Sequence, residues 1–183
     1  MSAVAVFQTS SIVGEAVATA AAGGTVLRAA FQKLPRGDHG FHIHTAGDLR
    51  GKGCTGACAH WHKGNPSSHG GPPSKSRKRH TGDLGNVRRG RTYKYYLRGV
   101  RPSELWGRTL VVHADPDDYG LGKHDDSATT GHSGARIGCA IFGRGAGGAG
   151  HPDGGSGQCG PRVTKRTGGA PRRRKLTNAT RRR

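Results

Sequence analysis

The feature that most constrains the fold is that apolar residues never repeat with a helical period over more than about ten residues. They occur instead in short runs with β character, separated by turn residues. These runs lie at 3–8, 14–20, 25–33, 40–44, 91–97, 108–113 and 136–142, with two long irregular stretches at 45–82 and 114–135. The pattern predicts an all-β sandwich or barrel with two long loops. Since loops of this length in a compact domain are usually functional, we expect the chemistry there.

Large apolar residues are scarce and the chain is strongly basic. Leu, Ile, Val and Phe account for 27 of 183 residues, 33 residues are Gly, and the net charge is +19. A large-aliphatic and Phe fraction below about 20% with high net charge is typical of disordered chains. The composition therefore excludes a large apolar core, a coiled coil and a membrane protein. It leaves a disordered basic protein, or a small-core domain stabilised by something other than apolar burial.

The positive charge is concentrated at the C-terminal end. Residues 144–183 contain 11 Lys and Arg, one acidic residue and no aromatic residue. Such a segment buries too little apolar surface to offset the entropy of ordering. We therefore predict a folded domain at 1–143 and a disordered basic Gly/Arg-rich tail at 144–183. Basic clusters at 75–79, 171–175 and 181–183 are typical of nuclear-import signals or of patches that contact nucleic acid and other polyanions, and a solvated tail without a partner is equally compatible.

The sequence shows neither a membrane-spanning segment nor a secretory signal. No run of about 18 apolar residues occurs, and the N-terminus lacks the basic leader and apolar stretch of a secretory signal. We expect a cytoplasmic protein without a membrane partner, or a nuclear one if the basic clusters direct import. In a reducing compartment, cysteines are usually free thiols or metal ligands. A zinc site made of all four cysteines stays open, although only Cys54 and Cys58 are closely spaced.

Histidine and carboxylate residues form the most distinctive chemical pattern. Strict alternation over residues 40–44 places His42 and His44 on one face of a strand, with Phe41 and Ile43 on the other. Four further histidines lie in the first long stretch, at positions 60, 62, 69 and 80, and Asp83 follows directly after it. The last candidate is His113, at the end of a Val-rich run. Imidazole suits copper and zinc, and a carboxylate completes many zinc sites. A single loop histidine is usually solvated, but a strand pair with a third histidine on another strand is more specific.

Taken in order, these motifs resemble the copper/zinc superoxide dismutase family. The matching segments are 40–44, 47–48, 54–55, 69–72, 80–87, 107–115 and 130–139. The resemblance covers roughly residues 3–143, and it is specific because the motifs recur in the family's order. It implies an eight-stranded Greek-key barrel or sandwich, immunoglobulin-like in architecture. It also implies an enzyme that converts superoxide to O2 and hydrogen peroxide by cycling between Cu(II) and Cu(I) at a His-bridged copper–zinc site.

The resemblance implies a role for each matching residue. The copper ligands correspond to His42, His44, His60 and His113, and the zinc ligands to His60, His69, His80 and Asp83, with His60 as the bridge. Asp117 corresponds to the carboxylate that hydrogen-bonds His42 and His69. Three residues correspond to catalytic groups: Arg136 draws the anion inward, Thr130 lies beside it in the channel, and His60 delivers a proton. Cys54 and Cys139 correspond to an intrasubunit disulfide.

Some residues keep alternative interpretations. The segment between His60 and His80 is longer than usual in the family, so His62 competes with His60 as the bridge, although the spacing from Cys54 favours His60. Two free thiols at Cys54 and Cys139 remain an alternative to the disulfide. Cys58 and Cys159 either form a second disulfide or stay unpaired. The histidines without a role, which we expect at the surface, are His39, His124, His132 and His151.

The resemblance also bears on partners and on rival functions. Besides superoxide, it implies a homodimer packed near the last strand, at 139–143, and a copper chaperone. One alternative is a non-enzymatic metal-binding or chaperone-like relative on the same fold. Another is a basic nucleic-acid-associated protein with the barrel as a scaffold. Because all seven ligand positions and Arg136 are filled, we prefer the enzyme.

Overall fold

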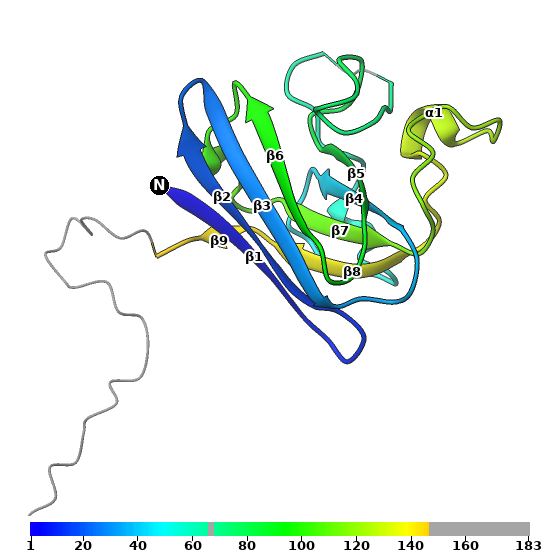
Figure 1. Cartoon of the computed structure of the whole chain (residues 1–183), viewed down its shortest axis with the longest axis horizontal. Coiled ribbons are helices and arrows are strands. Elements are labelled where there is room, and N and C mark those ends of the chain that lie inside the picture. The colour runs from blue at the N-terminus through cyan, green and yellow to red at the C-terminus, as the bar shows by residue number, and fades with distance from the viewer. Residues whose placement is uncertain (66–67, 147–183) are drawn as a thin grey trace, which may run out of the picture.

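Residues 1–65 and 68–146, which the computed structural model describes, form two antiparallel sheets (Figure 1). The first sheet has the order β6–β3–β2–β1–β9 and the second the order β5–β4–β7–β8. The strands are β1 (Ser2–Gln8), β2 (Val13–Ala21), β3 (Gly24–Lys33), β4 (His39–His44), β5 (Asp83–Val87), β6 (Thr92–Arg98), β7 (Thr109–His113), β8 (Arg136–Ile141) and β9 (Gly143–Arg144). Since β3 pairs with β6 and β4 with β7, the chain crosses repeatedly between the sheets in a Greek key. The predicted all-β fold is confirmed.

The apolar runs predict seven strands, and the structure adds β5 and β9. β5 was not predicted because both faces of this strand are covered. Four of its five residues are buried, so polar and apolar residues do not alternate along it. It also contains Gly85, whose φ of 80° lies in the left-handed region. β9 is a two-residue continuation of β8 that pairs with β1. The predicted boundary at 143/144 falls inside this strand, and the division into domain and tail stays a prediction.

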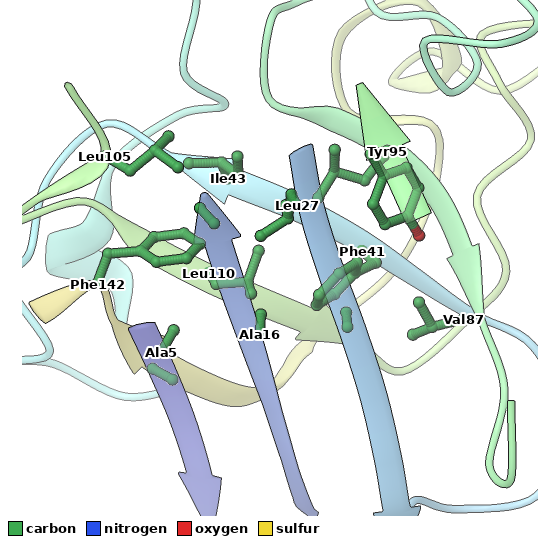
Figure 2. Packing of buried hydrophobic residues seen from close by; sticks show 14 of the residues in the cluster. Ala5, Ala16, Leu27, Phe41, Ile43, Val87, Tyr95, Leu105, Leu110 and Phe142 are labelled. Carbon is green, nitrogen blue, oxygen red and sulfur yellow. The ribbon is translucent and has the colours of Figure 1, made fainter. Parts of the chain in front are cut away.

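The core lies between the two sheets and is built largely from small residues and a few rings. In β1 to β3 every second residue is buried, because only one face of that sheet packs inward. Figure 2 shows Leu27 of β3 and Phe41 of β4 within this layer. Phe31 packs on Phe7 and Phe41, with ring centroids 5.4 and 5.6 Å apart. Alanines complete the core at positions 3, 5, 16, 18, 29 and 140. The small number of large apolar residues is therefore compatible with folding.

The two long loops lie beyond the second sheet (Figure 1). The first carries the 3-10 helix η1 (Thr55–Ala57), and the second carries the one-turn helix α1 (Ser127–Thr130); a further 3-10 helix, η2 (Pro102–Leu105), precedes β7. Backbone hydrogen bonding from His69 to Ala128 (2.9 Å) joins the loops. All residues of β4 and β7 are buried, so these loops cover their outer faces. In the described part of the chain, no helix is long and apolar enough to cross a membrane.

Candidate metal centre

Strand β4 places His42 and His44 on its outer face, and the first loop is paired to the end of that strand. His44 and His60 form an isolated antiparallel bridge, and the Trp61 amide donates to the Ile43 carbonyl at 2.7 Å. β7 brings His113 alongside, because it pairs with β4 residue by residue. The backbone pairing alone therefore brings the four imidazoles of His42, His44, His60 and His113 together.

The first cluster consists of four buried histidines. One nitrogen each of His42, His44, His60 and His113 lies within 4.8 Å of every other. Each of the three strand histidines uses one nitrogen in a hydrogen bond: His42 Nε2 with Asp117 Oδ2 (2.8 Å), His44 Nδ1 with the Cys58 carbonyl (2.8 Å) and His113 Nδ1 with the Gly134 carbonyl (3.2 Å). The remaining nitrogens, His42 Nδ1, His44 Nε2 and His113 Nε2, are buried with no hydrogen-bond partner among the described residues. Buried unpartnered acceptors are costly, so a bound cation accounts for them well.

The second cluster gathers around a carboxylate. Asp83 Oδ1 lies 2.9 Å from His60 Nδ1, 3.1 Å from His69 Nδ1 and 3.3 Å from His80 Nδ1. One ligand atom from each of these four residues also lies within 4.8 Å of the others. Three imidazoles and one carboxylate are a typical zinc set, whereas four imidazoles suit copper. The residues present therefore fit both metals that the resemblance implies.

His60 belongs to both clusters. Its Nδ1 faces Asp83, so Nε2, on the other side of the ring, is directed away from that carboxylate. The ring centroid of His60 lies 4.1 Å from that of His42 and 5.2 Å from that of His69. His62 joins neither cluster, since its Nδ1 accepts the Thr81 amide at 3.2 Å. His60, and not His62, is therefore the residue that the two clusters share.

Asp117 links the two clusters by hydrogen bonds to one histidine of each. Its Oδ2 pairs with His42 Nε2 and its Oδ1 with His69 Nε2, both at 2.8 Å. Asn86 holds the Asp117 backbone in place by accepting from its amide (2.7 Å) and donating to its carbonyl (2.9 Å). A Cβ at Gly131 would come within 2.2 Å of Asp117 Oδ1, so only glycine leaves room for this carboxylate. Such outer contacts fix the orientation of ligating rings.

Most histidines of the two clusters are neutral. Burial lowers the pKa of His44 to about 2 and the pKa of His113 to about 4, and it holds the pKa of His42 well below its ordinary value. Burial also lowers the pKa of His60. These rings keep a free lone pair for a cation. His69 differs: burial opposes its charged form, but hydrogen bonds to Asp117 and Asp83 outweigh it and raise the pKa to about 9.

Asp83 supplies the negative charge of the second cluster. Burial alone would raise the pKa of Asp83, but hydrogen bonds from His60, His69 and His80 outweigh burial and hold that pKa well below its usual range. The carboxylate is therefore ionised at neutral pH. A divalent cation would replace the protons that now link Asp83 to the rings.

An open cleft of about 670 Å³ leads to the clusters. Its lining includes His44, His60 and His113, together with Thr130 and Arg136. Arg136 donates through Nη1 to the Cys54 carbonyl (2.7 Å) and through Nη2 to the Cys58 carbonyl (2.6 Å). Burial lowers the pKa of Arg136, which remains a strong base and keeps its charge. The cleft therefore has a fixed cation beside the first cluster.

The predicted disulfide between Cys54 and Cys139 is confirmed, and it links the first loop to β8 across 85 positions. Cys58 is a free, exposed thiol, and Cys159 lies outside the described residues, as do His151 and nearly all of the predicted tail. Because the disulfide uses the sulfurs of Cys54 and Cys139, these two residues are not available as ligands of the all-cysteine zinc site.

One positioning residue was missed. We expected His39 at the surface, which is wrong: it is 3% exposed, and its Nδ1 bonds to the His113 carbonyl at 2.8 Å while Nε2 bonds to the Pro35 carbonyl at 3.2 Å. Its place two residues before the core residue Phe41 was the available signal. His124 and His132 are exposed, as predicted.

Comparisons with known proteins agree with this geometry. The sequence profile of copper/zinc superoxide dismutase (SODC) matches residues 12–142. The copper–zinc superoxide dismutase of Paramecium bursaria Chlorella virus 1 is 50% identical over 120 residues, covering 60% of this chain and 60% of that protein. A protein of Orgyia pseudotsugata multicapsid polyhedrosis virus that carries the same family name is 46% identical over 120 residues, covering 60% of this chain and 75% of that protein.

The fold is also found among solved structures. The crystal structure of the clock protein EA4 superposes with a TM-score of 0.67 and 34% identity, covering 78% of this chain and 93% of that one. The chain thus spans less than two thirds of the Chlorella virus protein but nearly all of this solved chain. Because the family profile extends from β2 to the residue after β8 and includes every residue of both histidine clusters, the chain belongs to the copper/zinc superoxide dismutase family.

Proposed function

We propose that the chain disproportionates superoxide, so that two superoxide anions and two protons yield O2 and hydrogen peroxide. Copper would be held by His42, His44, His60 and His113, and zinc by His60, His69, His80 and Asp83. When bound, copper supplies the one-electron couple that both half-reactions need. The observation that carries the proposal is that His60 belongs to both clusters and lines an open cleft together with Arg136.

Two residues of the cleft act on the substrate and its proton. Arg136 presents a guanidinium held by two backbone carbonyls, so its charge is oriented before superoxide arrives. A fixed positive charge in a cleft raises the encounter rate with an anion. While its Nε2 is not bound to copper, His60 would carry a proton on this nitrogen and pass it to the second superoxide, with Nδ1 still directed at Asp83. Thr130 lines the same cleft and lies beside the path of the substrate.

The partners and location belong to the same proposal. We propose a homodimer that packs near the last strand, which is supported by the exposed Ile137 and Ile141 of β8. We also propose delivery of copper by a chaperone, which the family resemblance implies. For the location we propose the cytoplasm, or the nucleus if the basic clusters direct import. Contact of the tail with polyanions rests on its Arg content.

The direct test measures metal content and superoxide decay with the same purified chain. We expect one copper and one zinc per subunit and a rate that falls as ionic strength rises, since salt screens the attraction of an anion. A fully metal-loaded chain that leaves superoxide decay unchanged would refute the enzyme and favour the non-enzymatic relative.

Replacing Asp117 with asparagine is expected to weaken metal binding about 10- to 100-fold, because an amide cannot accept from both His42 and His69. Competition with a chromophoric chelator measures this for zinc and copper separately. Asp118→Asn is the matched control, since Asp118 lies next in the same loop and bonds Ser127 and Gly120 instead of a cluster histidine. Equal affinity in both variants would show that Asp117 does not orient the rings.

Replacing Arg136 with alanine is expected to lower the superoxide rate constant about tenfold or more and to flatten its dependence on ionic strength. Arg136→Lys should give an intermediate rate, because it keeps the charge but not the two-pronged contact with the Cys54 and Cys58 carbonyls. Stopped-flow superoxide decay measures both, at matched copper content. If the alanine variant retained the wild-type salt dependence, Arg136 would have no role in steering.

A further inference from the structure

A second groove, which shares no lining residue with the metal cleft, lies between the first long loop and the end of β6. It encloses about 780 Å³. Its walls come from three parts of the chain: the turn between β2 and β3, residues 73–81 of the loop, and residues 96–98 of β6. The side chains that give it its character are His62, Arg77, Arg79, Tyr96 and Arg98.

The groove is positively charged, and no acidic residue lines it. Arg77 and Arg98 are exposed, and neither forms an ion pair or a side-chain hydrogen bond within residues 1–65 and 68–146. Arg79 donates to the backbone carbonyls of Thr81 and Asp83, so no carboxylate compensates its charge either. Uncompensated cations gathered in one concave surface attract an anion.

The nearest ion pairs on this side leave that charge unchanged. Lys63 donates to the carbonyl of Gly99, the residue after Arg98, at 2.7 Å and pairs with Glu104 at 2.8 Å. Glu104 also lies 3.5 Å from Arg101. The carboxylate of Glu104 is therefore already matched by two cations, and it does not neutralise Arg98.

Tyr96 adds a flat aromatic surface to the groove. Its side chain is 43% exposed, and its hydroxyl donates to the Ala22 carbonyl at 2.6 Å. This hydrogen bond holds the ring in one orientation, so little side-chain entropy is lost when a planar group stacks on it. Arginines around a fixed exposed ring are the combination that binds the phosphates and bases of an unpaired strand.

We propose that this groove binds single-stranded nucleic acid, with phosphates at Arg77 and Arg98 and one base stacked on Tyr96. An acidic peptide or a sulfated polysaccharide would use the arginines but not a held ring face. A duplex would not use the ring either, since its bases are stacked on each other. The groove shares no lining residue with the metal cleft, and it does not involve the predicted tail, which contains no aromatic residue.

The test uses the full chain and a fluorescent strand of about 12 thymidine nucleotides at about 100 mM salt, with binding followed by anisotropy. Arg77→Ala/Arg98→Ala is expected to weaken binding about tenfold and to reduce the slope of log Kd against log salt by about 1.4, for two phosphate contacts. Tyr96→Ala is expected to weaken binding about fivefold or more, and Tyr96→Phe, which keeps the ring, by less than about threefold. Superoxide activity and thermal unfolding report that each variant is folded.

The matched control is Arg89→Ala/Arg91→Ala, which removes the same charge. Both residues are exposed and precede β6, so they lie roughly 20 Å from Arg98 at the other end of the strand. We expect less than a twofold effect. Equal weakening by the two double variants would overturn the site, because binding would then follow net charge alone. A base-free phosphodiester strand or a heparin fragment that binds as tightly as the oligonucleotide, with no effect of Tyr96→Ala, would overturn nucleic acid as the ligand.

Discussion

Replacing His113 with alanine is expected to lower the superoxide rate constant by more than about 100-fold, since loss of an outer partner of a ligand alone typically costs about 10- to 100-fold. His113 is 5% exposed, and its Nε2 is one of three buried nitrogens of the first cluster that have no hydrogen-bond partner among the described residues. Removing it leaves three nitrogens in the first cluster and opens the side that faces the cleft. Copper content, the visible spectrum and superoxide decay should change together.

The control for this variant is His124→Ala, because His124 is exposed and belongs to neither cluster. It should keep wild-type copper content and rate. The second cluster, which fits zinc, does not include His113. Zinc binding should therefore survive in His113→Ala and show that the chain remains folded. A His113→Ala protein with undiminished activity would remove the first cluster from the mechanism.

Removing the disulfide with Cys54→Ala/Cys139→Ala is expected to lower the free energy of unfolding of the metal-free chain by about 4–5 kcal/mol. The bond closes a loop of 85 positions, and the entropy lost by an unfolded chain on such closure gives this magnitude. Denaturant unfolding in the presence of a chelator measures it, because bound metal would otherwise add its own stabilisation. Cys58→Ser, which removes only the free thiol, should change the free energy of unfolding by less than about 0.5 kcal/mol.

The same variant should also reduce activity when metals are restored. Cys54 lies at the start of the segment whose carbonyls hold Arg136 and His44. Without the disulfide, this segment loses its covalent link to β8 and keeps its hydrogen bonds with Arg136. A variant that lost less than about 1 kcal/mol of stability and kept full activity would show that hydrogen bonding alone fixes the loop.

Much of the fold could be predicted because its strands alternate locally. β1 to β3 were found to within a few residues, since their buried faces repeat every second position. β5 was not found, because burial on both faces removes that alternation. His39 was misplaced for a related reason, since a polar side chain that bonds two carbonyls inside the protein looks like a surface residue in the sequence.

The sequence alone is enough to place His42 and His44 on one face of a strand, because side chains alternate at a period of two wherever a strand forms. It also determined that the core would be small, because large apolar residues are few. Only the tertiary structure decided that His60 and not His62 joins both clusters, and that Arg77 and Arg98 meet around Tyr96. These outcomes depend on loops packing against distant strands, and such contacts carry no local periodicity that a sequence pattern could reveal.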